Sequence, residues 1–364
     1  MTASGPLAGV RIVEFDAIGP VPLAAMLLAD MGADILRIAR APNSGQAWDN
    51  TGGEVLNRNR KHIHLDLKQV DDRDQALAMI GKADAVIEGF RPGVMERLGL
   101  GPEVCQALNP RLVYARMTGW GQTGPLAPRA GHDLNYIAVT GALHAMGRPD
   151  APPPVPLNLV GDYGGGSMFA VMGLLAAIIS ARTTGQGQVV DVAMTDGTAA
   201  LTAMFHGLSA SGLWSRTRGV NLLDGSKPFY RCYACADGNH VAVGALEPQF
   251  FALLLEGLGL DPATYPQFDP SGWPAMAEAF AQVFATRTRD DWAARFEATD
   301  ACVSPVLDFN EAADHPHNHA RATLVTVEGV TQPAPAPRFV RTPTAIAPAR
   351  RGLISGEEAL AAWG

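Results

Sequence analysis

Charged residues are scarce in this chain of 364 residues, where Asp, Glu, Lys and Arg together make up 18%. The hydrophobic share of 47% is high enough to bury a sizeable core and argues against an intrinsically disordered chain. Positive charge is also in short supply, because 28 basic residues face 36 acidic ones and leave a net charge of −8. An acidic protein gains nothing from polyanions at long range, so general nucleic-acid binding is disfavoured. A few arginines can still form a local pocket for a small phosphorylated ligand.

Cysteines and long apolar runs are rare as well. The four cysteines, at positions 105, 232, 235 and 302, suggest no disulfide framework. The longest apolar run, 168–179, is too short to span a bilayer and is typical of a buried helix. The N-terminal residues lack the regions of a signal peptide, and the last four residues are not a peroxisomal address. We therefore expect a soluble cytoplasmic protein.

The first half of the chain alternates short apolar runs with helical patterns. Strands are expected over 10–15, 34–38, 63–67, 85–88 and 112–118, with helices over 23–31, 73–81 and 103–108. Strands and helices that alternate at this spacing predict βαβ units and a parallel sheet. The fold class is therefore α/β, with a Rossmann-like parallel sheet in a large domain.

The pattern changes in the second half. A long apolar helix is expected over 164–180, a strand over 188–194 and a helix over 195–209. A hairpin over 228–245 with its turn at Asp237-Gly238 comes before helices over 249–257, 274–285 and 289–298. These patterns predict a large domain over 1–200, completed by 318–364, and a smaller α+β domain over 225–315. Residues 201–224 and 316–317 are expected to link them.

Basic side chains gather where a nucleotide would bind in a doubly wound sheet. The end of the second expected strand usually carries an acid for a ribose hydroxyl, but here it carries Arg37 and Arg40. Further bases follow on later loops, at Arg58, Arg60, Lys61 and Arg91. Guanidinium groups bind phosphate through two hydrogen bonds, so a ribose phosphate is one interpretation, and a solvated basic rim is the other.

Three strings resemble ligand motifs without their usual context. Residues 119–124 match the dinucleotide fingerprint, but Pro125 and Pro128 stand where its helix should begin. Cys232 and Cys235 have metal-ligand spacing but no second pair, and in a strand they would point to opposite faces. His315, His317 and His319 lie on a Pro-containing loop without a carboxylate partner. We expect none of these strings to hold a dinucleotide or a metal.

Two helix starts carry side chains suited to proton transfer. Apolar residues after Gly131 recur at helical spacing, which places His132 at a helix N-terminus. The positive end of the helix dipole disfavours imidazolium, so we expect a neutral imidazole and first-turn amides able to bind a thioester oxygen. Asp162 precedes the long apolar helix and the glycines at 164–166, which would let a ligand approach. Taken singly, each is ordinarily a capping residue.

These strings together resemble the type III CoA-transferase superfamily over nearly the whole chain. The matching strings are 6–14, 27–34, 88–93, 114–124, the His132 and Asp162 motifs, 185–191, 236–238 and 244–248. The resemblance is closest to the α-methylacyl-CoA racemase branch, which shares Gly-His-Asp at 131–133 and Gly-Asp-Tyr-Gly-Gly-Gly at 161–166. One departure is Ala39-Arg40-Ala41-Pro42, where the family usually has an acid before Arg-Pro.

The resemblance implies a mechanism and a set of site residues. Its fold would be an interlocked homodimer in which each large domain faces the other subunit's small domain. His132 and Asp162 would be the two bases that move the α-proton of a 2-methylacyl-CoA thioester, and Glu247 would orient the histidine. No cofactor is needed for this chemistry, because coenzyme A is part of the substrate. The residues implied in acyl-CoA binding are Arg40, His64, Leu65, Asp66, Leu67, Arg91, Gly131, Asp133, Leu134, Asn135 and Tyr136.

Two other functions remain open at this point. A type III CoA-transferase would use Asp162 as a nucleophile that forms an acyl-aspartyl anhydride. A non-catalytic acyl-CoA-binding module would keep Arg40 and lose nothing when His132 is changed. His132 distinguishes the three, since neither alternative needs a base at that position. We expect neither a nucleic acid nor a membrane as a partner, and the metal site is expected to be absent.

Overall fold

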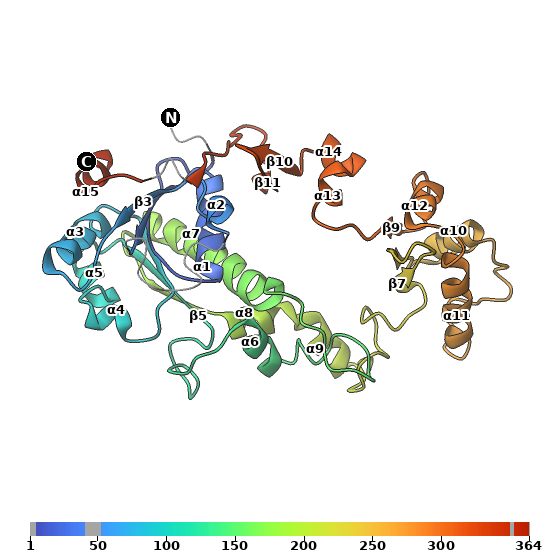
Figure 1. Ribbon diagram of the computed structural model, residues 1–364. Coiled ribbons are helices and arrows are strands. Elements are labelled where there is room, and N and C mark those ends of the chain that lie inside the picture. Colours follow the sequence, from blue (N-terminus) through green and yellow to red (C-terminus); the bar gives the residue numbers. More distant parts are fainter. Residues whose placement is uncertain (1–4, 41–51, 350–352, 364) are drawn as a thin grey trace. The chain divides into compact units, whose positions relative to one another are not determined.

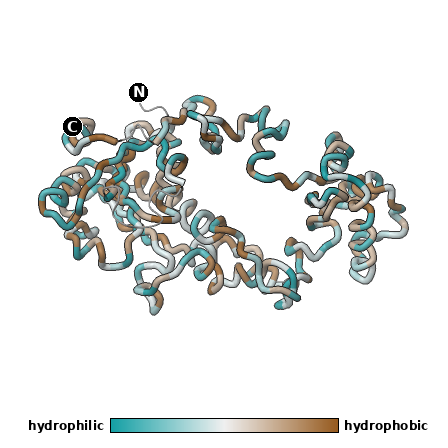
Figure 2. Tube along the Cα trace, viewed as in Figure 1, coloured by the Kyte–Doolittle hydropathy of each residue, from teal (hydrophilic) through white to brown (hydrophobic). Residues whose placement is uncertain are grey.

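The computed structural model describes residues 5–40, 52–349 and 353–363. Contacts within the chain divide it into two compact units (Figure 1). Unit 1 comprises residues 1–142, 155–203 and 316–364, and unit 2 comprises residues 143–154 and 204–315. Apolar and polar stretches alternate along the chain in both units (Figure 2). Ala41 and Pro42, where the sequence departs from the family pattern, lie outside the described residues.

Unit 1 contains the predicted parallel sheet, in the order β3-β2-β1-β4-β5-β6. This strand order is that of a doubly wound nucleotide-binding fold. Its strands are β1 (Arg11–Phe15), β2 (Asp34–Ala39), β3 (Lys61–His64), β4 (Ala85–Glu88), β5 (Val113–Thr118) and β6 (Val189–Ala193). The α/β fold class is thereby confirmed, and the strand bounds differ from those expected by at most three residues.

Alternation along the strands gives the sheet two apolar faces. Ile12 and Ile35 face one core, whereas their neighbours Val13 and Leu36 face the other, because successive side chains of a strand point to opposite sides. Helices cover both faces, as a parallel sheet requires. The first core contains residues of α1 (Pro20–Asp30) and α7 (Met168–Thr184), and the second contains residues of α3 (Val70–Ile80), α5 (Pro102–Leu108) and α15 (Gly356–Ala362).

The long apolar helix begins earlier than the sequence indicated. It opens as a π-helix, η1 (Leu159–Ser167), and continues as α7, so that 159–184 form one helical stretch. By length and composition the whole stretch is apolar enough to cross a membrane, although the run predicted at 168–179 is by itself too short. Half of its most apolar window is buried inside the protein, and a core helix passes the same test.

Shorter elements complete unit 1. They are α2 (Gly53–Leu56), α4 (Val94–Arg97), α6 (Asp133–Val139), α8 (Met194–Leu201), α14 (Pro316–Ala320), β10 (Leu324–Val327) and β11 (Val330–Pro333). The last two form an antiparallel hairpin. Arg58 is buried against Asp30 at 2.5 Å and donates to Gln332 of that hairpin, so the returning C-terminal segment is bound to the first helix.

Unit 2 is a small α+β unit with its own core. Its sheet has the order β7-β8-β9, made of Tyr230–Ala234, His240–Gly244 and Val303–Pro305. The helices α10 (Pro248–Leu258), α11 (Trp273–Phe284) and α12 (Arg289–Phe296) pack aromatic residues such as Phe280 and Trp292 into this core. Two further helices, α9 (Ala203–Ala210) and α13 (Glu311–Asp314), lie near the beginning and the end of the main segment of this unit, residues 204–315. The hairpin turn predicted at Asp237-Gly238 is present between β7 and β8.

Candidate active site

A cavity of about 1710 Å³ opens in unit 1 where the strands of the sheet end. This position follows from the fold, because doubly wound sheets bind ligands beyond the carboxyl ends of their strands. The cavity brings together most of the site residues expected from the sequence. Those that line it are Arg40, His64, Leu65, Asp66, Leu67, Arg91, Gly131, His132, Tyr136 and Asp162.

The basic residues near the cavity have different partners. Arg40 is exposed at its rim, whereas Arg37 also lines it but forms a 2.5 Å ion pair with Asp16. Arg60 is buried and lies 2.5 Å from Glu14. Arg58 and Arg60 therefore belong neither to a ribose-phosphate site nor to a solvated basic rim, because their charges are neutralised inside the protein. Arg40 and Arg91 line the cavity, so their guanidinium groups lie where the sequence predicts them.

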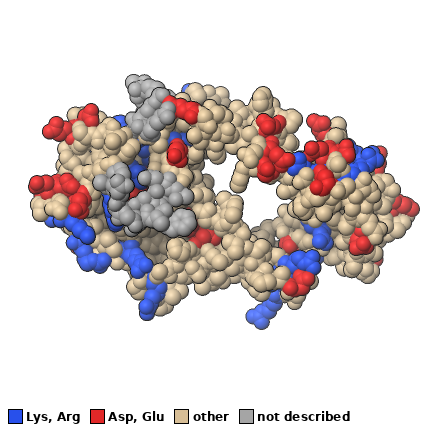
Figure 3. Space-filling view, in the orientation of Figure 1, with Lys and Arg blue, Asp and Glu red and all other residues tan. Residues whose placement is uncertain are grey.

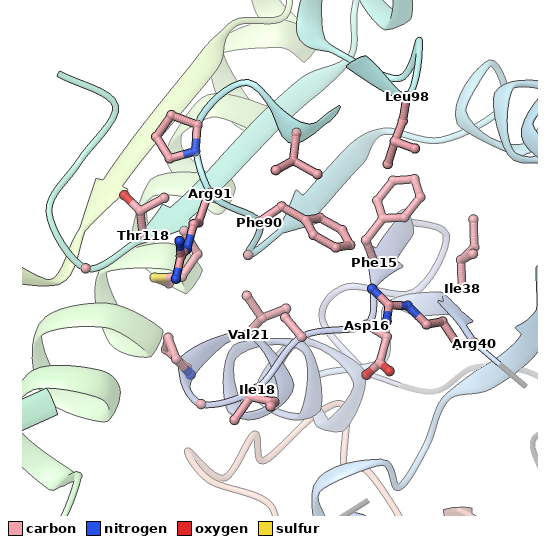
Figure 4. A pocket seen from close by; sticks show the side chains of 18 of the residues that line it. Phe15, Asp16, Ile18, Val21, Ile38, Arg40, Phe90, Arg91, Leu98 and Thr118 are labelled. Atoms are coloured by element: carbon pink, nitrogen blue, oxygen red, sulfur yellow. The ribbon is translucent and has the colours of Figure 1, made fainter. Parts of the chain in front are cut away.

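Apolar and cationic side chains both line the cavity. Figure 4 shows Phe15, Phe90 and Leu98 on one side of the view, while Arg91 lies on the other side beside Thr118. Lys and Arg side chains also gather along one edge of unit 1 in the space-filling view (Figure 3). The cavity thus offers both an apolar surface and cationic groups, as a ligand with a ring system and phosphates requires.

His132 lies at the start of α6, as the sequence predicts. It is the N-cap residue, and its backbone amide donates to the side chain of Asn135 at 3.1 Å. The side chain is exposed and lines the cavity. The residue therefore caps the helix through its backbone while its side chain lines the cavity.

Tyr136 explains two glycines of the motif-like strings. A Cβ atom at Gly119 would lie 2.0 Å from the Tyr136 ring, and one at Gly131 would lie 2.7 Å from it. The Tyr136 hydroxyl donates to the carbonyl of Gly131, directly before His132. Residues 119–124 form bends rather than the start of a helix. The glycines at 119 and 131 therefore serve the packing of an aromatic ring.

Asp162 lies in the π-helix η1 and lines the same cavity as His132. The pKa of its carboxyl is raised to about 6, mainly because burial disfavours the charged form. The nearby charge of Asp133 contributes to this rise. The Asn158 side chain donates to its Oδ2 over 3.4 Å, and this bond together with the charge of His132 lowers the pKa. The net effect is a carboxyl able to hold a proton close to neutral pH.

The neighbouring helix start offers Asp162 little stabilisation. A Cβ atom at Gly19 would lie 3.1 Å from Asp162 Oδ2, so the residue before α1 touches this carboxyl. Helix N-termini normally favour a carboxylate through their free amides. Here α1 begins with Pro20-Val21-Pro22, and two of these three residues have no N–H to donate. The start of α1 therefore offers few amides to stabilise the Asp162 carboxylate, which agrees with its raised pKa.

Three expected binding residues do not line the cavity: Asp133, Leu134 and Asn135. Asp133 is buried beneath Asp162, and Asn135 accepts the amide of His132. Glu247 lies in unit 2, where it is exposed at the N-cap of α10. Its proposed pairing with the histidine stays a prediction.

Cavity residues that the sequence did not reveal include Arg129, Lys68 and Trp120. Arg129 follows the Pro-containing turn after residue 124, and nothing in its local pattern distinguishes it from a solvated loop residue. In the described ranges, no three His, Cys, Asp or Glu side chains are grouped to hold a metal.

Comparisons with known proteins agree with this fold. The model of CoA-transferase family III matches residues 7–351. An alpha-methylacyl-CoA racemase of Mus musculus is 44% identical over 353 residues, covering 96% of this chain and 91% of the relative. The racemase of Homo sapiens is 42% identical, with the same coverage of both chains. A hypothetical protein from Mycobacterium tuberculosis has a solved structure that matches with a TM-score of 0.80, 25% identity and full coverage of both chains. The chain therefore belongs to CoA-transferase family III.

Proposed function

We propose that this protein is an α-methylacyl-CoA racemase, an isomerase that interconverts the 2R and 2S forms of 2-methylacyl-CoA thioesters. The observation that carries the proposal is that His132 and Asp162 line one cavity, where the carboxyl has a pKa of about 6. Two racemases of this family share more than two fifths of their aligned residues with the chain. The resemblance in the sequence and the chemistry of the cavity thus support the same reaction.

The mechanism is a 1,1-proton transfer through an enolate. A thioester acidifies its α-hydrogen, and inverting one carbon needs a base on one face and an acid on the other. Neutral His132 takes the proton from the 2S form, while protonated Asp162 supplies a proton to the opposite face. In reverse, the Asp162 carboxylate takes the proton and the imidazolium returns one.

The same protonation count serves both directions. Each starting state holds one proton on the pair, either on Asp162 or on His132. A carboxyl with a pKa of about 6 can populate both states near neutral pH. The first-turn amides of α6, beside His132, are candidates to bind the enolate oxygen. The chemistry is complete with protein groups and the thioester, so no metal or pyridoxal group enters the mechanism.

The remainder of the substrate would occupy the rest of the cavity. Arg40 and Arg91 would bind the phosphates of coenzyme A, with the backbone of 64–67 along the same ligand. We further propose a homodimer in which Glu247 of one subunit orients the histidine of the other. A cytoplasmic location also remains a proposal from the sequence.

The test is isotopic. One enantiomer of a 2-methylacyl-CoA is incubated with the protein in deuterated water, and optical purity and α-deuterium are followed together. We expect loss of enantiomeric excess together with gain of deuterium, and no racemisation by His132→Ala. Absence of both changes in the unmodified protein would contradict the proposal.

The alternative is transfer of CoA between carboxylic acids, which the family name itself describes. It would use Asp162 as a nucleophile and predicts ping-pong kinetics with a trappable acyl-aspartyl adduct. Passage of CoA to an added carboxylate, without α-exchange, would assign the protein to that chemistry. A module that only binds acyl-CoA would show neither reaction and would bind unchanged in His132→Ala.

A further inference from the structure

The carboxylate of Asp133 is buried between the two proposed proton-transfer residues. Only 6% of this residue is exposed. Its Oδ2 accepts hydrogen bonds from the amide of Gly161 and from the amide of Asp162, each at 2.7 Å. Its Oδ1 is buried without a partner among the described residues. One charged side chain therefore holds the backbone of Asp162 directly.

The contact joins two elements that are far apart in the sequence. Asp133 follows His132 and is the first residue of α6, while Gly161 and Asp162 belong to η1. Charge-assisted hydrogen bonds of this kind are short and roughly twice as strong as neutral ones. Because the backbone of His132 and that of Asp162 are tied through one carboxylate, the spacing of the two side chains depends on it.

The neighbouring glycine is adapted to this contact. A Cβ atom at Gly161 would lie 2.7 Å from Asp133 Oδ2 and 3.0 Å from a side-chain carbon of Ile137. Any larger residue would force the carboxylate away from the two amides. The close approach is therefore specific to the pair of Asp133 and Gly161.

We propose that Asp133 is a positioning residue for proton transfer, which fixes the backbone of Asp162 relative to His132 and does not itself contact the acyl-CoA. This inference rests on the proposed racemase function and departs from the binding role that the family resemblance implied. It agrees with the absence of Asp133 from the residues that line the cavity.

The charge of Asp133 has a second effect, on the proton of Asp162. It raises the pKa of Asp162, although burial contributes more. The other groups that act on this carboxyl are His132 and Asn158, which both lower the pKa, and the Tyr136 ring also interacts with it. Removing the charge of Asp133 alone should therefore make Asp162 a stronger acid that gives up its proton at lower pH.

Two substitutions separate geometry from charge. In Asp133→Asn the side-chain oxygen can still accept both amides, but the charge is lost. We expect kcat to fall about tenfold, the acid limb of the kcat profile to move to lower pH, and KM to change less than about twofold. Asp133→Ala also loses the two hydrogen bonds, and we expect kcat to fall ~100-fold because the two bases lose their alignment.

Asp237→Asn is the matched control. Asp237 also accepts two backbone amides, those of Asn239 and Arg289, but it lies in unit 2 and does not line the cavity. We expect its kcat and pH profile to match those of the unmodified protein. Thermal unfolding of every variant shows whether a loss of activity only reflects a loss of folded protein.

The outcomes are distinct. A rise in KM with unchanged kcat in Asp133→Asn would make Asp133 a substrate contact and overturn the proposal. If the pH profile is unshifted and activity falls only in proportion to the folded protein, Asp133 has a structural role alone. That outcome would also overturn the proposal. If the unmodified protein shows no racemisation, the proposed function fails instead. In that case, carbon-13 NMR titration of Asp162 in the unmodified protein and in Asp133→Asn still tests the coupling.

Discussion

At the scale of single residues, the site depends on a carboxyl that its surroundings stabilise poorly as an anion. Asp162 is largely buried, receives one long hydrogen bond from Asn158, and lies beside a helix start that is rich in proline. Burial and the missing N–H donors favour the protonated form, whereas the Asn158 hydrogen bond favours the anion and offsets them only in part. A carboxyl with such a raised pKa is typical of functional sites, because a well-solvated aspartate could not donate a proton near neutral pH.

This leads to a prediction about stability. The pKa of Asp162 in the folded protein, about 6, lies above the value of an unfolded aspartate, so ionisation penalises the folded state. The penalty is absent below about pH 4, grows as the pH rises to about 6 and is constant above it. Asp162→Asn should therefore be inactive yet more stable at pH 8, by about 1–2 kcal/mol after allowance for partial solvent exposure.

Thermal unfolding at two pH values measures this effect. At pH 8 we expect the melting temperature of Asp162→Asn to exceed that of the unmodified protein by about 2–4 °C. At about pH 3 the difference should disappear, since the aspartate is then largely protonated in both states. Equal melting temperatures at pH 8 would show that the carboxylate is better solvated than the structure indicates.

At the scale of elements, η1 determines where Asp162 lies. A π-helical segment is uncommon and costs stability, and it often marks a functional position. Here glycines let it pack tightly against α8: a Cβ atom at Gly165 would lie 2.5 Å from Thr198 Oγ1, and one at Gly197 would lie 1.9 Å from the Gly165 carbonyl oxygen. The run of glycines is therefore needed for the contact between two helices, rather than for ligand approach alone.

Gly165→Ala tests this packing. The added methyl group meets backbone and a buried hydroxyl, so we expect a loss of about 1–3 kcal/mol in unfolding free energy. We also expect slower α-deuterium exchange, because η1 would shift and carry Asp162 with it. Gly207→Ala is the control, since a Cβ atom there meets nothing within 4 Å, and alanine should stabilise α9 slightly. Full activity and stability of Gly165→Ala would disprove the tight contact.

At the scale of the whole molecule, the C-terminal segment completes unit 1. Arg11 donates to the carbonyl of Trp363 at 2.9 Å, and the Trp363 indole N–H donates to Asp34 at 2.9 Å. The Trp363 side chain is buried in the second core with 3% exposure. Trp363 is therefore bound to the first residues of β1 and β2.

Trp363→Ala should weaken unit 1 without weakening unit 2. Truncation of a buried tryptophan costs about 3–5 kcal/mol. In urea we expect two transitions to separate, with the one assigned to unit 1 moved to lower urea concentration. Trp214→Ala, in the half-buried part of unit 2, should leave the unit 1 transition in place. A single unshifted transition in Trp363→Ala would contradict this assignment.

The sequence by itself determined the fold class, the parallel sheet and the helix start at His132. Apolar runs and their spacing are local signals, and they were enough to predict the strands of the sheet. The family strings likewise brought Arg40, Arg91, His132 and Asp162 together before any coordinates. Local pattern was also enough to reject residues 119–124 as a dinucleotide fingerprint.

Only the tertiary structure decided what surrounds these side chains. The pairing of Arg60 with Glu14, the burial of Asp133 under the amide of Asp162 and the contact of Gly19 with Asp162 each join residues far apart in the sequence. The π-helical start of the long helix also depends on close packing against α8, which periodicity does not reveal. Burial and neighbouring charge set the proton affinity of Asp162, and both are properties of the folded chain.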